Sequence, residues 1–211
     1  MNHASSRSYT AFVGTTRIAS GDLPSVACKI KAAWNPEGSA PLLIFDDATS
    51  RLAEVDLRGT LQDVLTRIAE EIGNEGQSSQ PASSDDDTRR PGRPKLGVVA
   101  REVTLLPRHW EWLATQPGGA SVALRKLVEQ ARLANQAKDR RRRAQDVTYR
   151  FLSAVAGNES YFEEAARALF AGNKEPFERI VDSWPIDIAE HAKKLAADAF
   201  ETPVAAVDAG Q

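Results

Sequence analysis

The pattern of apolar and polar positions in residues 8–73 predicts a small domain of strands and helices. Short β-prone apolar runs predict strands, while an apolar residue at every third or fourth position predicts a helix. The expected elements are strands at 9–13 and 17–19, a helix from 24, strands at 42–45 and 52–57, and a helix from 61 capped by Thr60. The predicted order is therefore β-β-α-β-β-α.

The pattern changes in residues 98–136, which read as a strand followed by two helices. Residues 98–106 are β-prone, Pro107 follows them, and residues 108–115 have helical spacing. Residues 116–119 are rich in Gly and Pro and end this helix. Ser121 is well placed to cap the next helix, which carries Leu and Val on one face.

Residues 137–200 are predicted to be helical throughout. Gly-Asn pairs at 157–158 and 172–173 end two helices, and Pro176 and Pro185 begin two more. The fold class is therefore α+β, with an α/β domain first and an all-α segment last.

Residues 74–97 separate the first domain from the middle of the chain. From Asn74 to Thr88 there is no large apolar residue, and Ser, Gln, Gly, Pro and Asp dominate. Such a segment buries too little apolar surface to offset the entropy lost on ordering. We therefore expect a disordered linker here.

Charge is distributed unevenly along the chain. Residues 89–150 hold 15 of the 27 Lys and Arg residues with only five acidic ones, which gives this segment a net charge of +10. Each flank carries −6, so the formal total is only −2. A basic segment between two acidic ends is the pattern expected of a protein that binds a polyanion.

The remaining composition limits the class of protein. Cys28 is the single cysteine, which excludes an intramolecular disulfide and fits a reducing compartment. The first seven residues contain no apolar run of a signal peptide, and no stretch is apolar enough for a membrane span. We expect a cytoplasmic protein that makes no contact with the membrane.

No catalytic motif is present. The chain has no glycine-rich phosphate loop, no cluster of His and Cys, and no nucleophile elbow. Asp46 and Asp47 suit a hairpin turn, and Glu54 and Asp56 fall on the polar side of the predicted strand. We therefore interpret these carboxylates as structural, and we expect neither an enzyme, nor a cofactor, nor a metal.

The end of the linker reads Arg-Arg-Pro-Gly-Arg-Pro-Lys at 89–95. This run resembles the AT-hook, whose extended Gly-Arg-Pro core lies in the narrow minor groove of A·T-rich DNA. The resemblance implies that Gly92, Arg93 and Pro94 form the core. It also implies that Arg89, Arg90 and Lys95 contact phosphates. The alternative is a stiff basic linker.

The strand-helix-helix order of 98–136 resembles the ribbon-helix-helix family, with Pro107 at the step from strand to helix. That resemblance implies a homodimer in which two strands pair and enter the major groove. It also implies that residues 120–122, which include Ser121, face phosphate. Arg101 and Thr104 are the strand residues suited to contact DNA, although they lie on opposite faces of a regular strand, and Glu102 opposes binding.

Further basic residues follow in the long helical part. Four successive arginines at 140–143 surround a helix and repel one another, so they would gain from contact with phosphate. The alternative for this run is a solvated junction. The expected phosphate contacts of this region are Arg125, Lys126, Arg140, Arg141, Arg142 and Arg143.

Two longer segments are similar to a bacterial family of unknown function, domain of unknown function 2239. They read GRPKLGVVAREVTLLPRHW at 92–110 and GGASVALRKLV at 118–128, and residues 169–172 and 184–185 fit as well. The resemblance implies a cytoplasmic bacterial protein, and it supplies no reaction or ligand.

These observations predict a non-enzymatic, dimeric, DNA-associated protein that acts as a transcriptional regulator. One alternative is an antitoxin-like module, in which the ribbon dimerises and the acidic helices bind a protein partner. Another is a small-molecule sensor located in the α/β domain at 8–73.

Overall fold

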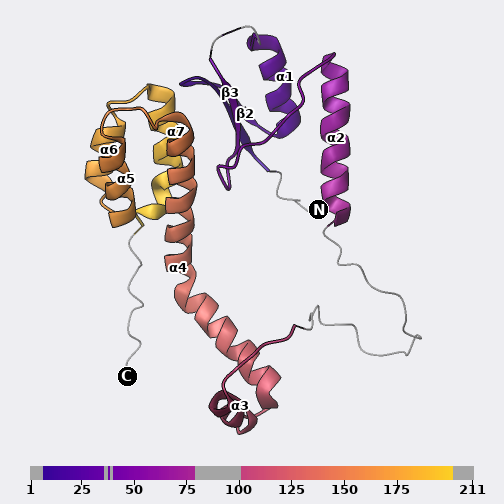
Figure 1. Cartoon of the computed structure of the whole chain (residues 1–211), viewed down its shortest axis with the longest axis vertical. Coiled ribbons are helices and arrows are strands. Elements are labelled where there is room, and N and C mark those ends of the chain that lie inside the picture. The colour runs from indigo at the N-terminus through magenta and orange to yellow at the C-terminus, as the bar shows by residue number, and fades with distance from the viewer. Residues whose placement is uncertain (1–6, 36–37, 39, 79–100, 202–211) are drawn as a thin grey trace, which may run out of the picture. The chain divides into compact units, whose positions relative to one another are not determined.

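The structure is a computed structural model that describes residues 7–35, 38, 40–78 and 101–201 (Figure 1). The chain divides into two compact units. Unit 1 comprises residues 1–77 and 137–211, and unit 2 comprises residues 78–136. The α/β elements and the C-terminal helices, which the sequence pattern treats as separate domains, therefore belong to one unit.

The helices and strands of unit 1 follow the mixed α+β pattern. They are β1 (Tyr9–Val13), β2 (Thr16–Gly21), α1 (Leu23–Ala33), β3 (Leu42–Asp46), α2 (Leu61–Ser78), the second part of α4 (Gly119–Val155), α5 (Phe162–Ala171), α6 (Lys174–Val181), α7 (Ile186–Ala196) and a 3-10 turn, η1 (Ala197–Ala199). Unit 2 contains α3 (Pro107–Ala114) and the first part of α4.

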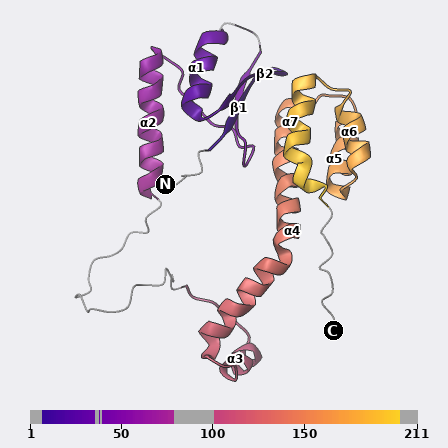
Figure 2. The same ribbon diagram turned by 180° about the vertical axis from the view of Figure 1, so that it is seen from behind.

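The sheet of unit 1 has the order β2-β1-β3, with both neighbours antiparallel to β1. Because successive side chains of a strand point to opposite faces, β1 contributes to two cores. Ala11 faces α1 and α2, where it packs in a cluster with Ile30 and Val64. Phe12 faces the other way and packs in a cluster with Phe151 of α4. The sheet thus lies between two helical layers (Figures 1 and 2).

Local hydrogen bonds explain where the first two helices begin. The side chain of Asp22 accepts from the backbone N–H of Ser25 at 2.8 Å and caps α1. At α2, the backbone N–H of Thr60 donates to Asp63 at 2.8 Å, while the N–H of Asp63 donates to the Thr60 hydroxyl at 3.3 Å. This reciprocal pair is a capping box, so the predicted cap at Thr60 is confirmed.

The predicted fourth strand at 52–57 is wrong. Only Leu52 forms a bridge, to Phe45, before the chain leaves the sheet. The carbonyl groups that follow accept from basic side chains instead. Lys31 Nζ donates to the carbonyls of Leu57 and Gly59 at 3.0 and 2.9 Å, and Arg67 donates to the carbonyl of Asp56 at 2.9 Å. These bonds satisfy the three carbonyl groups without a neighbouring strand.

Two predicted boundaries also need correction. Helix α2 runs to Ser78, five residues into the predicted linker at 74–97. The sequence offers no proline to stop it before Pro81. Helix α4 begins at Gly119 rather than after Ser121, because Gly118 and Gly119 adopt positive φ angles of 85° and 77° and complete the turn from α3. The rest of the predicted linker lies outside the described residues.

The predicted strand at 98–106 is not formed over its described part. Residues 101–106 have no regular structure, and residues 98–100 lie outside the described ranges. A strand requires a neighbour to satisfy its N–H and C=O groups, and the described part of the chain offers none to this segment. The ribbon-helix-helix fold is therefore not confirmed, because residues 101–106 form no strand within this single chain.

The aromatic core of unit 1 contains one titratable group, His191 of α7. Its ring centroid lies 4.6 Å from that of Phe151 and 5.5 Å from that of Phe12, and the side chain is 1% exposed. Its Nε2 atom has no hydrogen-bond partner among the described residues. The pKa of His191 is lowered to about 4, chiefly because burial disfavours the charged ring. The negative charge of Asp47 raises this pKa, and the positive charges of Lys194 and Arg17 lower it.

The pH dependence of stability follows from this shift. Because the folded pKa lies below the unfolded value of 6.5, the unfolded state binds more protons between these values, and stability is lost as pH falls from 6.5 to 4. We expect His191 to contribute a loss of about 3 kcal/mol across this window. Urea unfolding at pH 7 and pH 4 measures it, with His191→Leu as the comparison.

The variant should be much less sensitive to this pH change than the wild type. Carboxylates titrate similarly in both proteins, so the difference between the two isolates His191. Equal pH dependence in the two proteins would contradict the assignment.

Candidate nucleic-acid interface

The residues predicted to contact DNA fall in three parts of the chain. The six hook residues lie outside the described residues: Arg89, Arg90, Gly92, Arg93, Pro94 and Lys95. Arg101 and Thr104 are exposed in the irregular segment before α3. The remaining candidates all lie on α4, with Ser121 in its first turn.

The first turns of α4, in unit 2, present two cations to solvent. Arg125 and Lys126 are both exposed. Arg125 Nε donates to the backbone carbonyl of Ser121 at 3.0 Å, a bond that holds its guanidinium against the helix. Ser121 lies inside the helix and its side chain is exposed, but it does not cap the helix as predicted.

The arginine run at 140–143, in unit 1, divides into two kinds of residue. Arg140 forms an ion pair with Glu201 at 3.6 Å, and Arg141 donates to the carbonyl of Ala171 at 3.3 Å. Arg142 and Arg143 are exposed, and within the described residues neither has an ion-pair partner. Part of the basic run therefore serves the fold, and part of it remains available to a ligand.

Arg141 binds at the C-terminal end of α5, where backbone carbonyls lack helical partners. Gln145 Nε2 donates to the carbonyls of Leu169 and Phe170 at 3.0 and 3.1 Å beside it. Gly172 makes room for the guanidinium, because a Cβ there would lie 2.0 Å from Arg141 Nη2. A cation at this end also interacts favourably with the helix dipole.

Unit 2 exposes an unusual share of its apolar side chains. Within residues 101–136 only Leu113 and Ala123 are buried. Seven large apolar side chains there are between 41% and 64% exposed: Val103, Leu106, Trp110, Trp112, Leu127, Val128 and Leu133. Trp110 and Trp112 lie two residues apart on α3 and point to different sides of that helix, so the name that we use for these seven exposed residues together, the apolar face of unit 2, does not imply a flat surface. Large apolar side chains that are exposed as one contiguous patch are typical of an interaction site.

Three charged residues that the sequence did not single out as binding residues lie near the arginine run. Asp47 follows β3, Lys194 lies on α7 and Asp198 lies on η1, and together with Arg140 and Arg143 they line a cavity of about 350 Å³. No sequence motif marks this set, because the residues come from three separate segments of the chain.

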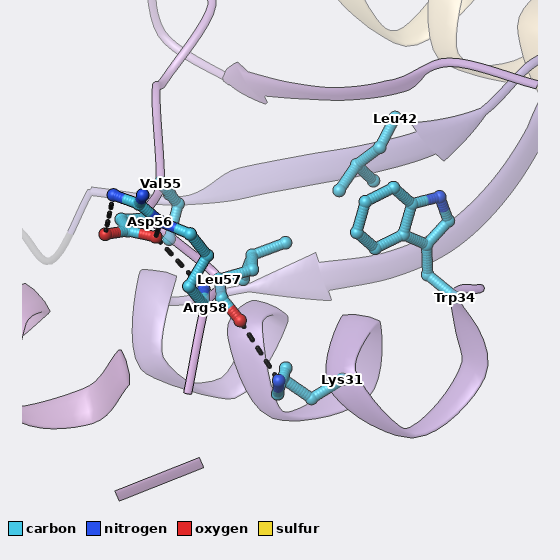
Figure 3. Close-up of a pocket in the computed structure, with 7 residues that line it drawn as sticks. All are labelled: Lys31, Trp34, Leu42, Val55, Asp56, Leu57 and Arg58. Atoms are coloured by element: carbon cyan, nitrogen blue, oxygen red, sulfur yellow. Dashed lines mark hydrogen bonds and ion pairs between the residues drawn. The ribbon is translucent and has the colours of Figure 1, made fainter. Parts of the chain in front are cut away.

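A second cavity, of about 650 Å³, lies beside α1 (Figure 3). Trp34 and Leu42 form an apolar wall at one end. At the other end Arg58 binds Asp56 through two hydrogen bonds of 2.9 Å, and these bonds hold the pKa of Asp56 well below its usual range. Lys31 donates to backbone carbonyls, so the charged groups of this lining already have partners. The cavity could admit an apolar molecule, as a sensor would require.

Of the carboxylates interpreted as structural, Asp46, Asp47 and Asp56 bind other groups of the protein. The side chain of Asp46 accepts from the backbone N–H groups of Ala48 and Thr49 at 2.9 and 3.0 Å, which is an Asx turn. Across the described ranges, no cluster of His, Cys, Asp or Glu has the arrangement that a metal ion needs. In the same ranges, every helix is too short or too polar to cross a bilayer.

Residues 8–196 match the model of a family described as uncharacterized proteins conserved in bacteria, DUF2239. The chain belongs to this bacterial family. Comparison with curated proteins and with solved structures gave no match.

Proposed function

We propose that this chain is a non-enzymatic, cytoplasmic DNA-associated protein that binds DNA through its basic centre and regulates transcription. The observation that supports this most strongly is the state of the cations on α4. Arg125, Lys126, Arg142 and Arg143 are exposed, and none of them has a carboxylate partner among the described residues. When exposed cations of this kind bind a nucleic-acid backbone, they release its condensed counterions, and this release favours binding.

Some arginines of the basic segment already bind groups of the protein itself, which reduces the number that are free to contact DNA. Arg140 and Arg141 contact Glu201 and the end of α5. Their guanidinium groups have to leave these partners before they can bind a phosphate fully. Arg142 and Arg143 need no such exchange, so we assign them the larger share of affinity within this run.

We further propose that the protein is a homodimer formed through the apolar face of unit 2. The described residues of this unit bury too little apolar surface for an independent core. A second copy would cover Trp110, Trp112 and Val128 with equivalent residues, as a two-fold interface requires. In such a dimer the segments at 98–106 of the two copies would pair as antiparallel strands, which is the ribbon-helix-helix arrangement.

The hook at 89–95 is proposed to add contacts in the minor groove of A·T-rich DNA. Pro91 and Pro94 favour an extended backbone, and Gly92 permits a close approach to the groove. Arg93 would enter the negative potential of the groove. This contribution depends on sequence composition, whereas the contacts made by α4 depend on charge alone.

The salt dependence of DNA binding tests the main proposal. If about six cations contact phosphate, the logarithm of the affinity should fall with the logarithm of salt concentration at a slope near −5. Replacing Arg125 and Lys126 with Gln should make this slope shallower by about 2. Fluorescence anisotropy with a labelled duplex at increasing NaCl measures both values.

The matched control replaces Arg167 and Arg179 with Gln. Both are exposed, on α5 and α6, and this change removes the same charge from residues outside the proposed contacts. Its slope should equal that of the wild type. If binding does not depend on salt, or if the two double variants behave alike, the DNA proposal fails and the protein-interaction alternative gains support.

The dimer is tested by placing a charge in the apolar face. Val128 is 64% exposed, so Val128→Glu should leave the fold of one chain intact while it introduces a desolvated charge at the proposed interface. We expect the wild type to sediment as a dimer at micromolar concentration, and Val128→Glu to sediment as a monomer. Analytical ultracentrifugation gives both masses.

Ile186 provides the control for this experiment. It is 73% exposed and lies at the start of α7, in unit 1. Ile186→Glu should therefore leave the dimer unchanged. A wild type that is monomeric at every concentration would refute the proposed interface.

A further inference from the structure

The cavity beside the arginine run is formed by three segments of unit 1 that are far apart in sequence. Asp47 comes from the turn after β3, Arg140 and Arg143 come from α4, and Lys194 and Asp198 come from the end of the chain's helical part. The cavity measures about 350 Å³. Three cations and two carboxylates line it, so its formal charge is +1.

One of the two carboxylates, that of Asp47, already has three donors within the protein. Asp47 accepts from the hydroxyl of Thr10 at 2.7 Å and from that of Ser8 at 3.0 Å, and Lys194 Nζ lies 3.4 Å from its Oδ2. Its side chain is only 13% exposed. Asp47 therefore has donors of its own, and its contact with Lys194 places that ammonium at the lining of the cavity.

The guanidinium of Arg143 is the group with unused binding capacity. It is exposed, and the described part of the chain contains no ion-pair partner for it. Arg140 has an ion-pair partner, Glu201, at 3.6 Å from its Nη1, and it would exchange this partner for a phosphate; 51% of its side chain is exposed. Both arginines lie on α4 three residues apart, which places them on neighbouring positions of one helix face.

We infer that this cavity is a binding site for a phosphate group. Guanidinium groups present a planar fork of donors that matches phosphate oxygens, and the ammonium of Lys194 adds a third donor group from another helix. The same chemistry serves a free phosphate monoester and a phosphate of a nucleic-acid backbone. The inference goes beyond the proposed function, because a free phosphate can occupy the cavity without DNA.

The apolar part of the lining favours a phosphate that carries an organic group. Ala144, Val147 and Leu195 form the rest of the wall beside the charges. A phosphate group alone is smaller than this cavity, so space remains for a substituent against these side chains. An organic phosphate with a small apolar portion would therefore fill the cavity better than inorganic phosphate does.

Occupation of the cavity also has a consequence for stability. The ligand would contact the turn after β3, α4 and α7 together, and these segments are correctly placed only in the folded protein. A ligand that binds only the folded state raises stability in proportion to the logarithm of its concentration. Binding can therefore be followed by the thermal unfolding of the full chain.

The test is a titration of the full chain with inorganic phosphate, at an ionic strength held constant with NaCl. We expect phosphate to raise Tm more than chloride does. Arg143→Gln and Lys194→Gln should each weaken the phosphate dependence by about tenfold in apparent affinity. Asp198→Asn should strengthen it, because the change removes a negative charge from the lining.

Lys193→Gln is the matched control for Lys194→Gln. Lys193 is the neighbouring residue on α7 and also has one ion-pair partner, Asp182, but it does not line the cavity. Its phosphate dependence should stay within about twofold of the wild type. The inference is overturned if phosphate acts no more strongly than chloride, or if Lys193→Gln weakens binding as much as Lys194→Gln.

A final arm identifies the source of the phosphate. If a saturating DNA duplex displaces inorganic phosphate, the site serves the nucleic-acid backbone; if both bind together, it serves a free phosphate monoester. The titration itself contains no DNA, so its result does not depend on whether the proposed DNA binding is correct. Failure of one proposal therefore leaves the other open to its own test.

Discussion

The structure of unit 1 depends on one aromatic cluster that joins the sheet to α4 and α7. Phe12 of β1 and Phe45 of β3 pack against Phe151 of α4, with ring centroids 5.3 and 5.2 Å apart, and His191 of α7 closes the group. All four side chains are at most 1% exposed. Without this cluster, the face of the sheet opposite α1 and α2 would remain exposed to water. Its burial therefore joins the N-terminal and C-terminal parts into one compact unit.

The same cluster determines which arginines of the run at 140–143 face the protein and which face solvent. Once Phe151 is buried, the helical period of α4 determines which of the preceding arginines face the protein. Arg141 meets the end of α5 together with Gln145, while Arg142 and Arg143 remain exposed. Self-repulsion within the run is thus relieved in part by the fold itself, and the remaining cations are those that we propose bind phosphate. The apolar face of unit 2 is a separate feature, and the proposed dimer would cover it.

Much of the secondary structure could be predicted because its causes are local. The hairpin of β1 and β2, the cap at Thr60 and the helix that follows Pro185 all depend on neighbouring residues. The failures have a different cause. Residues 52–57 alternate like a strand, yet Lys31 and Arg67 take up the carbonyl groups that a strand would use. The cavity at Arg143 could not be predicted, since no local pattern indicates that distant segments of the chain meet there.

The central claim is that the sheet and the C-terminal helices unfold together because they share the aromatic cluster. Hydrogen–deuterium exchange of the full chain with Phe151→Leu tests it most directly, because Phe151 lies on α4 and belongs to neither β1 nor α7. The account predicts that amides of β1 and α7 lose protection by the same factor in this variant. Faster exchange in α7 with unchanged protection in β1 would contradict it.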